Sequence, residues 1–116
     1  MNSEIEINLE KQDDITIFDV QGDVTAFSEP FFNEAYQTAN DQGASKILLK
    51  FTEDAYINSG GIAILIQLLA ETKRNNQQIT ITGLSNHFKK IFNMVGITKF
   101  AQIYNTVDEA VNDMAM

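Results

Sequence analysis

The stretch Tyr56-Ile57-Asn58-Ser59-Gly60-Gly61-Ile62 joins two segments of different character. Residues 46–51 before it are apolar and strand-forming, and residues 62–69 after it follow an apolar helical pattern. A hydroxyl followed by two glycines therefore stands where a loop leads into the N-terminus of a helix. Helix N-termini carry free backbone N–H groups and a partial positive charge, which suits anions such as phosphate. Ser59 is thus either a cap of this helix or a chemically modified residue.

Apolar periodicity on both sides of this stretch predicts an alternation of strands and helices. Residues 4–10 alternate apolar and polar side chains, and residues 15–20 do so less strictly, as expected of two antiparallel strands joined by a turn. The continuous apolar run at 46–51 indicates a central strand buried on both faces. Two further short strands are predicted at 79–82 and 101–104.

Four helices are predicted between and after these strands. One of them, from Ile62 to about Lys73, is apolar almost all round in its first turns. The other three place apolar residues on one helix face: Phe32, Ala35, Tyr36 and Ala39, then Phe88, Ile91, Phe92 and Val95, and finally Val107, Ala110, Val111 and Met114. The order is β-β-α-β-α-β-α-β-α, which predicts an α/β domain with a mixed sheet of about four to five strands and four helices.

The composition excludes several classes of function. The 116 residues contain no cysteine and one histidine, His87, which leaves little room for a metal cluster or a catalytic triad. The net charge of −8 argues against nucleic-acid binding. The longest apolar run is interrupted by Gln67 and the N-terminus is acidic, so neither a membrane span nor a signal peptide is expected. We expect a cytoplasmic protein without cofactors, metal or catalytic residues.

The charges are unevenly distributed along the chain. Residues 1–42 contain ten acidic side chains and a single base, Lys11, whereas residues 72–107 contain five bases and no acid. Such a dipolar surface can orient a protein partner, and it can equally be an ordinary solvated surface.

Three segments resemble the STAS domain family, whose best-known members are bacterial anti-sigma-factor antagonists. Gln21-Gly22-Asp23 stands where the family has Gly-Glu or Gly-Asp before a polar loop. Ile57-Asn58-Ser59-Gly60-Gly61-Ile62 is similar to the family's Asp-Ser-Ser/Thr-Gly-Leu-Gly, read from the Asn58 position. Phe88-Lys89-Lys90-Ile91-Phe92-Asn93-Met94-Val95-Gly96-Ile97 is similar to a family helix closed by Gly-Leu or Gly-Ile. The resemblance covers nearly the whole chain and implies one STAS domain over residues 1–116.

The resemblance also implies how such a site works. Ser59 matches the position that is phosphorylated in the antagonists by a partner kinase, which doubles as the anti-sigma factor. The unmodified form binds this kinase and releases the sigma factor, the phosphorylated form does not bind, and a serine phosphatase resets the switch. The other residues expected at the site are the switch-loop residues Asn58, Gly60 and Gly61 and the partner-binding residues Asp23, Thr25 and Ile62.

Two positions in this stretch keep an alternative open. Asn58 replaces the family's usual aspartate, and Gly60 replaces its second hydroxyl residue. The alternative is a STAS accessory subunit that docks constitutively on another protein, such as the ATPase of a lipid transporter, with Ser59 serving only as a helix cap. An enzyme is not indicated, because the chain has neither a P-loop nor a dinucleotide-binding glycine pattern. The oligomeric state stays open.

Overall fold

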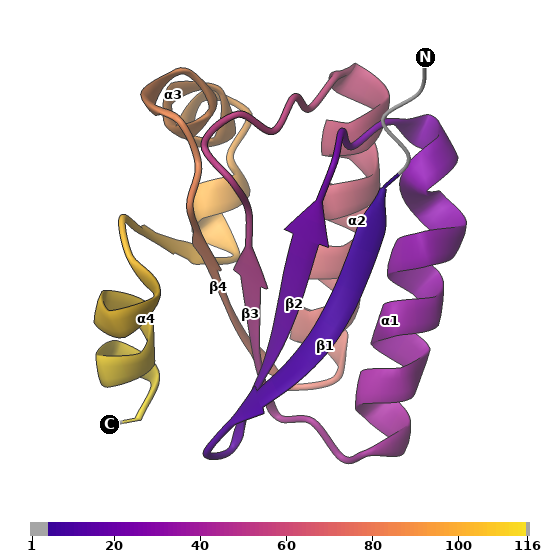
Figure 1. Cartoon of the computed structure of the whole chain (residues 1–116), viewed down its shortest axis with the longest axis vertical. Helices are drawn as coiled ribbons and strands as arrows, with labels where there is room; N and C mark the ends of the chain where they lie inside the picture. Colours follow the sequence, from indigo (N-terminus) through magenta and orange to yellow (C-terminus); the bar gives the residue numbers. More distant parts are fainter. Residues whose placement is uncertain (1–4, 116) are drawn as a thin grey trace.

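The computed structural model describes residues 5–115 and contains one mixed five-stranded sheet (Figure 1). The sheet has the order β1-β2-β3-β4-β5, with β1 antiparallel to β2 and all other neighbours parallel. Its strands are β1 (Glu6–Gln12), β2 (Ile15–Gln21), β3 (Lys46–Lys50), β4 (Gln78–Thr82) and β5 (Gln102–Tyr104). The predicted α/β class, the element order and the antiparallel first pair are confirmed.

The helices form a layer on each side of the sheet. They are α1 (Glu29–Asp41), α2 (Ser59–Arg74), α3 (Asn86–Met94) and α4 (Val107–Met114), with short 3₁₀ turns η1 (Ala26–Ser28) and η2 (Ile97–Lys99). Figure 1 shows α1 and α2 on one face and α4 on the other. Because the parallel strands follow one another in sequence order, right-handed crossovers place α1 and α2 on the same face.

Two hydrophobic cores, one on each face of the sheet, explain why the buried positions of the central strand β3 are all apolar. The larger core includes Phe18, Ile47 and Leu49 beneath the helices on the α1 and α2 side. On the opposite face, Ile15, Ile17 and Leu48 pack with three residues of α4, namely Ala110, Val111 and Met114. Strand β2 is therefore buried on both faces over most of its length, which is why its alternation in the sequence is imperfect.

Helix α2 is the longest helix of the described chain, and it is buried along one side. Ile64, Leu65 and Leu68 lie in the core, whereas Ala63 and Gln67 are exposed. Within residues 5–115, no helix combines the length and the apolar character that crossing a membrane requires.

The predicted boundaries differ from the observed ones at several places. The strand expected at 4–10 is β1, which begins at Glu6; residues 1–4 and 116 lie outside the described residues. The inward position expected for Val95 is wrong, because α3 ends at Met94 and Val95 is the half-exposed C-cap. The two 3₁₀ turns were not expected. Of the adjacent rings in α1, Phe32 is buried and Phe31 is 43% exposed.

Gly83 occupies a position that no larger residue can take, where β4 ends beside β3. Its φ of +87° lies in the left-handed region, and a β-carbon there would lie 1.9 Å from the carbonyl oxygen of Phe51. The two strand ends are held together by the backbone N–H of Phe51, which donates to the Thr82 carbonyl at 2.9 Å. Gly43 also has a positive φ, of +78°, but the space around it is open.

This difference gives a matched pair of substitutions. We expect Gly43→Ala to lower the free energy of unfolding by about 1–2 kcal/mol, because only backbone strain is added. Gly83→Ala adds the clash with Phe51 and should cost about 2–5 kcal/mol. Urea denaturation followed by circular dichroism measures both, and equal losses in the two variants would contradict the close strand contact.

Candidate functional site

Asn58, and not Ser59, caps helix α2. Asn58 has an extended backbone (φ −90°, ψ −178°), and its side-chain oxygen accepts a hydrogen bond from the Gly61 N–H at 2.9 Å. Ser59 is the first helical residue, and its side chain is exposed. The expectation that Ser59 could cap the helix is therefore wrong, because the cap must have the extended backbone that Asn58 has. This arrangement leaves the Ser59 hydroxyl out of the capping interaction.

The loop before α2 is tied to the loop after β2 by backbone hydrogen bonds. Val24 and Ile57 form a parallel bridge, in which the Val24 N–H donates to the Tyr56 carbonyl at 2.8 Å and the Asn58 N–H donates to the Val24 carbonyl at 3.1 Å. The Tyr56 N–H also donates to the Asp23 carboxylate at 3.4 Å. The two segments that carry the predicted site residues, 22–28 and 56–62, therefore form one surface, which we call the switch surface.

The two glycines of the switch loop make this close approach possible. A β-carbon on Gly61 would lie 2.2 Å from the Val24 carbonyl oxygen, and one on Gly60 would lie 3.0 Å from the Ala26 backbone nitrogen. Without a side chain, each glycine lets another backbone come close. The backbone that approaches is the chain's own loop after β2, so the glycines build the surface rather than merely exposing it.

Thr25 shapes the loop after β2 through a reciprocal capping box. Its hydroxyl accepts from the Phe27 N–H at 3.2 Å, while its own N–H donates to the Ser28 hydroxyl at 3.0 Å. The Ser28 hydroxyl in turn lies 3.4 Å from the Asp23 carbonyl that it donates to. The predicted site residue Thr25 thus has an internal role, and its side chain is half-buried.

Two exposed aromatic residues on the switch surface were not predicted. The Phe27 side chain is 88% exposed and that of Tyr56 is 56% exposed. One signal in the sequence points to the exposure of Phe27. This residue lies between Thr25 and Ser28, outside any segment with apolar periodicity. Of the residues that were predicted, Ser59 is exposed and Ile62 is half-buried on the first turn of α2.

The charged residues next to the two loops in the sequence are acidic. Residues 12–45 and 51–72, which contain both loops, include no lysine or arginine. Glu29, Glu53 and Asp54 are exposed in these segments, and Lys89 of α3 lines a hollow together with Glu53. The loops of the switch surface therefore carry an exposed hydroxyl and two exposed aromatic rings, with acidic residues flanking them in the sequence.

The shifted pKa values belong to residues outside both loops. A hydrogen bond from Lys46 lowers the pKa of Asp14, whose carboxylate lies 3.1 Å from the Lys46 ammonium. A hydrogen bond to Asp113 raises the pKa of Tyr104. Among residues 5–115, no cluster of three or more acidic or histidine side chains is arranged to hold a metal ion.

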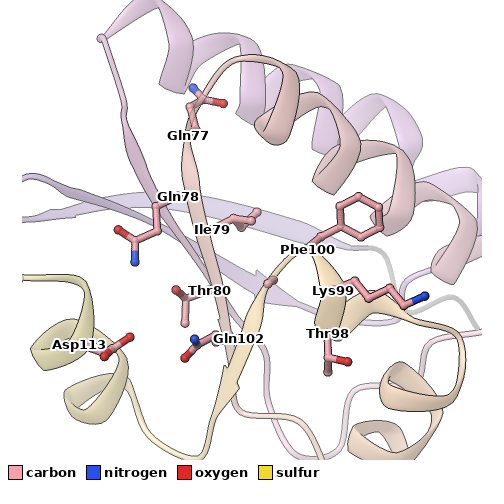
Figure 2. Close-up of a pocket in the computed structure, with 10 residues that line it drawn as sticks. Gln77, Gln78, Ile79, Thr80, Thr98, Lys99, Phe100, Gln102 and Asp113 are labelled. Carbon is pink, nitrogen blue, oxygen red and sulfur yellow. The ribbon is translucent and has the colours of Figure 1, made fainter.

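A polar pocket of about 330 Å³ lies away from the switch surface, between the β4–β5 edge, η2 and α4 (Figure 2). Thr80, Gln102 and Asp113 point toward a common space, whereas Lys99 extends away from them. Its lining includes none of the predicted site residues. The pocket therefore has no evident part in a switch at Ser59.

Comparison with known proteins assigns the family of this chain. The chain belongs to the STAS domain family, whose model matches residues 6–110. It is 26% identical over 109 residues to the anti-sigma-B factor antagonist of Listeria monocytogenes. The aligned region covers 94% of this chain and 95% of the relative.

Solved structures share the fold at lower sequence identity. An anti-sigma factor antagonist from Mycobacterium paratuberculosis superposes with a TM-score of 0.80 at 16% identity, covering 97% of this chain and 96% of the other. The anti-sigma factor antagonist SpoIIAA in its unphosphorylated form gives a TM-score of 0.70 at 16% identity and covers 95% and 97% of the two chains. SpoIIAA has also been solved in a phosphorylated form.

The capping assignment can be tested by comparing two neighbouring residues. We expect Asn58→Ala to lower the free energy of unfolding by about 1 kcal/mol, because the Gly61 N–H loses its acceptor. Ser59→Ala should change it by less than about 0.5 kcal/mol, because that side chain is exposed. Asn58→Asp keeps an acceptor at the helix N-terminus and should retain the wild-type value. Chemical denaturation checks all three, and a larger loss in Ser59→Ala than in Asn58→Ala would refute the assignment.

Proposed function

We propose that this chain is an anti-sigma-factor antagonist or a similar partner-switching regulator, controlled by phosphorylation of Ser59. It acts by binding an anti-sigma factor that is also a serine kinase, it catalyses no reaction of its own, and residues 1–116 form one STAS domain. The observation that carries the proposal is the position of Ser59, which is exposed, first in α2 and not used as its cap.

The first turn of α2 suits a phosphorylated serine. A phosphate adds about −1.5 to −2 charges, which the partial positive charge of a helix N-terminus stabilises. The Asn58 side chain is neutral, so it does not repel a phosphate on the next residue, as a carboxylate would. The replacement of the family's aspartate by Asn58 is therefore compatible with modification at Ser59.

The same phosphate removes a bound partner by acting at the centre of the switch surface. The unmodified hydroxyl is small and neutral, so a protein can cover it together with Asp23, Thr25 and Ile62. A phosphate at this place is bulky, and burying its charge against a partner carries a large desolvation cost. Its removal by a serine phosphatase restores the binding-competent surface.

The relatives support a partner-switching role over a constitutive one. The Listeria protein is named for antagonism of an anti-sigma factor, and SpoIIAA is known in unphosphorylated and phosphorylated forms. The proposed partners here are therefore an anti-sigma factor with serine kinase activity and a serine phosphatase.

Substitutions at Ser59 test the switch with a purified anti-sigma-factor kinase from the organism that makes this protein. We expect ATP and the kinase to phosphorylate wild type but not Ser59→Ala, as measured by intact mass. Ser59→Ala should bind the kinase with wild-type affinity, whereas Ser59→Asp should bind at least about tenfold more weakly.

Ser45→Asp is the matched control, because it adds the same charge to an exposed serine just before β3, at the opposite end of the sheet. It should bind as wild type does. If Ser59→Asp binds with wild-type affinity, control by phosphorylation of Ser59 is wrong. Equal losses of affinity in both aspartate variants would show that net charge, and not the position of the added charge, decides binding.

A further inference from the structure

Phe27 is the most exposed large apolar side chain of the described chain, at 88%. It lies in the short turn η1 between β2 and α1, and it adds nothing to either hydrophobic core. A single exposed ring is common on protein surfaces. Two further observations, the rigidity of its turn and its neighbours, indicate a binding role.

Hydrogen bonds within η1 and to Thr25 brace the turn that carries Phe27. The Phe27 N–H donates to the Thr25 hydroxyl, and the Ser28 N–H donates to the Thr25 carbonyl at 2.9 Å. Ala26, the residue before Phe27, lies so close to Gly60 at the start of α2 that a β-carbon on Gly60 would be 3.0 Å from it. A side chain on such a rigid base loses little backbone freedom on binding, which is what an interface anchor requires.

Phe27 shares its surface with Ser59 and with a second exposed ring. Ala26 and Gly60 are in contact, so Phe27 and Ser59 are each one residue away from that contact. Tyr56 is 56% exposed on the other loop, and its ring packs edge-to-face on Phe88 with centroids 6.1 Å apart. The backbones of Phe27 and Ser59 therefore lie close together, and a second exposed ring, that of Tyr56, is supported by Phe88 on the loop that carries Ser59.

The charges around these rings restrict the kind of partner. Glu29, Glu53 and Asp54 are exposed beside the two loops that form the surface, and no lysine or arginine occurs in residues 12–45 or 51–72. Lys89 of α3 lines a hollow together with Glu53. A protein that covers this surface must not bring carboxylates against it, whereas lysine and arginine would be attracted.

We propose that Phe27 is the anchor of the partner interface and inserts its ring into an apolar pocket of a protein whose pocket rim carries lysine or arginine side chains. This inference deepens the proposed function, because it concerns the same surface. A basic rim attracts the added negative charge, but the bulk of the phosphate and the cost of desolvating it beside an apolar contact oppose this attraction, and they break the complex when Ser59 is phosphorylated.

Photocrosslinking tests the anchor without assuming which partner binds. We would replace Phe27, and separately Met94, with p-benzoylphenylalanine in the organism that makes the protein, and identify crosslinked proteins by mass spectrometry. Met94 is the matched control, since it is 82% exposed at the end of α3 and outside the switch surface. We expect a protein crosslinked through position 27 at a basic and apolar site, and not through position 94. Equal crosslinking at both positions, or none at position 27, overturns the inference.

Affinity measurements with the crosslinked protein, purified, complete the test. Phe27→Ala should weaken its binding at least about tenfold and Met94→Ala less than about twofold, with circular dichroism showing that both variants fold. Binding should also weaken as salt rises, and Glu53→Gln should reduce that salt dependence. Wild-type affinity in Phe27→Ala overturns the inference, as does binding that is indifferent to salt.

These outcomes separate the inference from the proposed function. A partner that is anchored at position 27 but has no kinase activity supports the anchor and contradicts control by phosphorylation. A kinase that phosphorylates Ser59 and binds Phe27→Ala as tightly as wild type supports the switch and contradicts the anchor.

Discussion

The close approach of Gly61 to the Val24 carbonyl is the constraint on which the switch surface depends. No side chain fits between them, since a β-carbon would lie 2.2 Å from that oxygen. The contact allows the Val24–Ile57 bridge, which joins a loop after β2 to a loop after β3 and places both beside the first turn of α2. Residues distant in the sequence therefore form one rigid surface, and a change at Ser59 occurs on a surface that also holds Phe27.

Three residues at the start of α2 have separate roles. Asn58 caps the helix, Gly61 provides the capped N–H and the close approach, and Ser59 is left exposed. The start of the helix thus depends on Asn58 and Gly61 and not on the Ser59 hydroxyl. A residue that can be modified without unfolding the domain is what a reversible switch requires, because both forms must stay folded to be interconverted.

The sequence predicts the element order well because apolar periodicity is local information, and the STAS resemblance adds the site's position. The features that the sequence does not predict depend on contacts between distant segments or on backbone angles. Asn58 and Ser59 are both good capping residues, and only the extended backbone of Asn58 decides between them. The exposure of Phe27 was not predictable from its residue type, since phenylalanine is usually buried. Val95 continues an apolar spacing in the sequence, but α3 ends before it.

Phosphopeptide mapping of the protein isolated from the organism that makes it tests the central claim most directly. Trypsin cleavage after Lys50 and Lys73 gives one peptide that contains Ser59 together with three other hydroxyl residues, Thr52, Tyr56 and Thr72. Fragmentation must therefore localise the phosphate within this peptide. We expect a fraction of the protein to carry phosphate on Ser59 alone, and this fraction to increase when the cognate phosphatase is deleted. Phosphate on another residue of this peptide, or none in the phosphatase deletion strain, would contradict it.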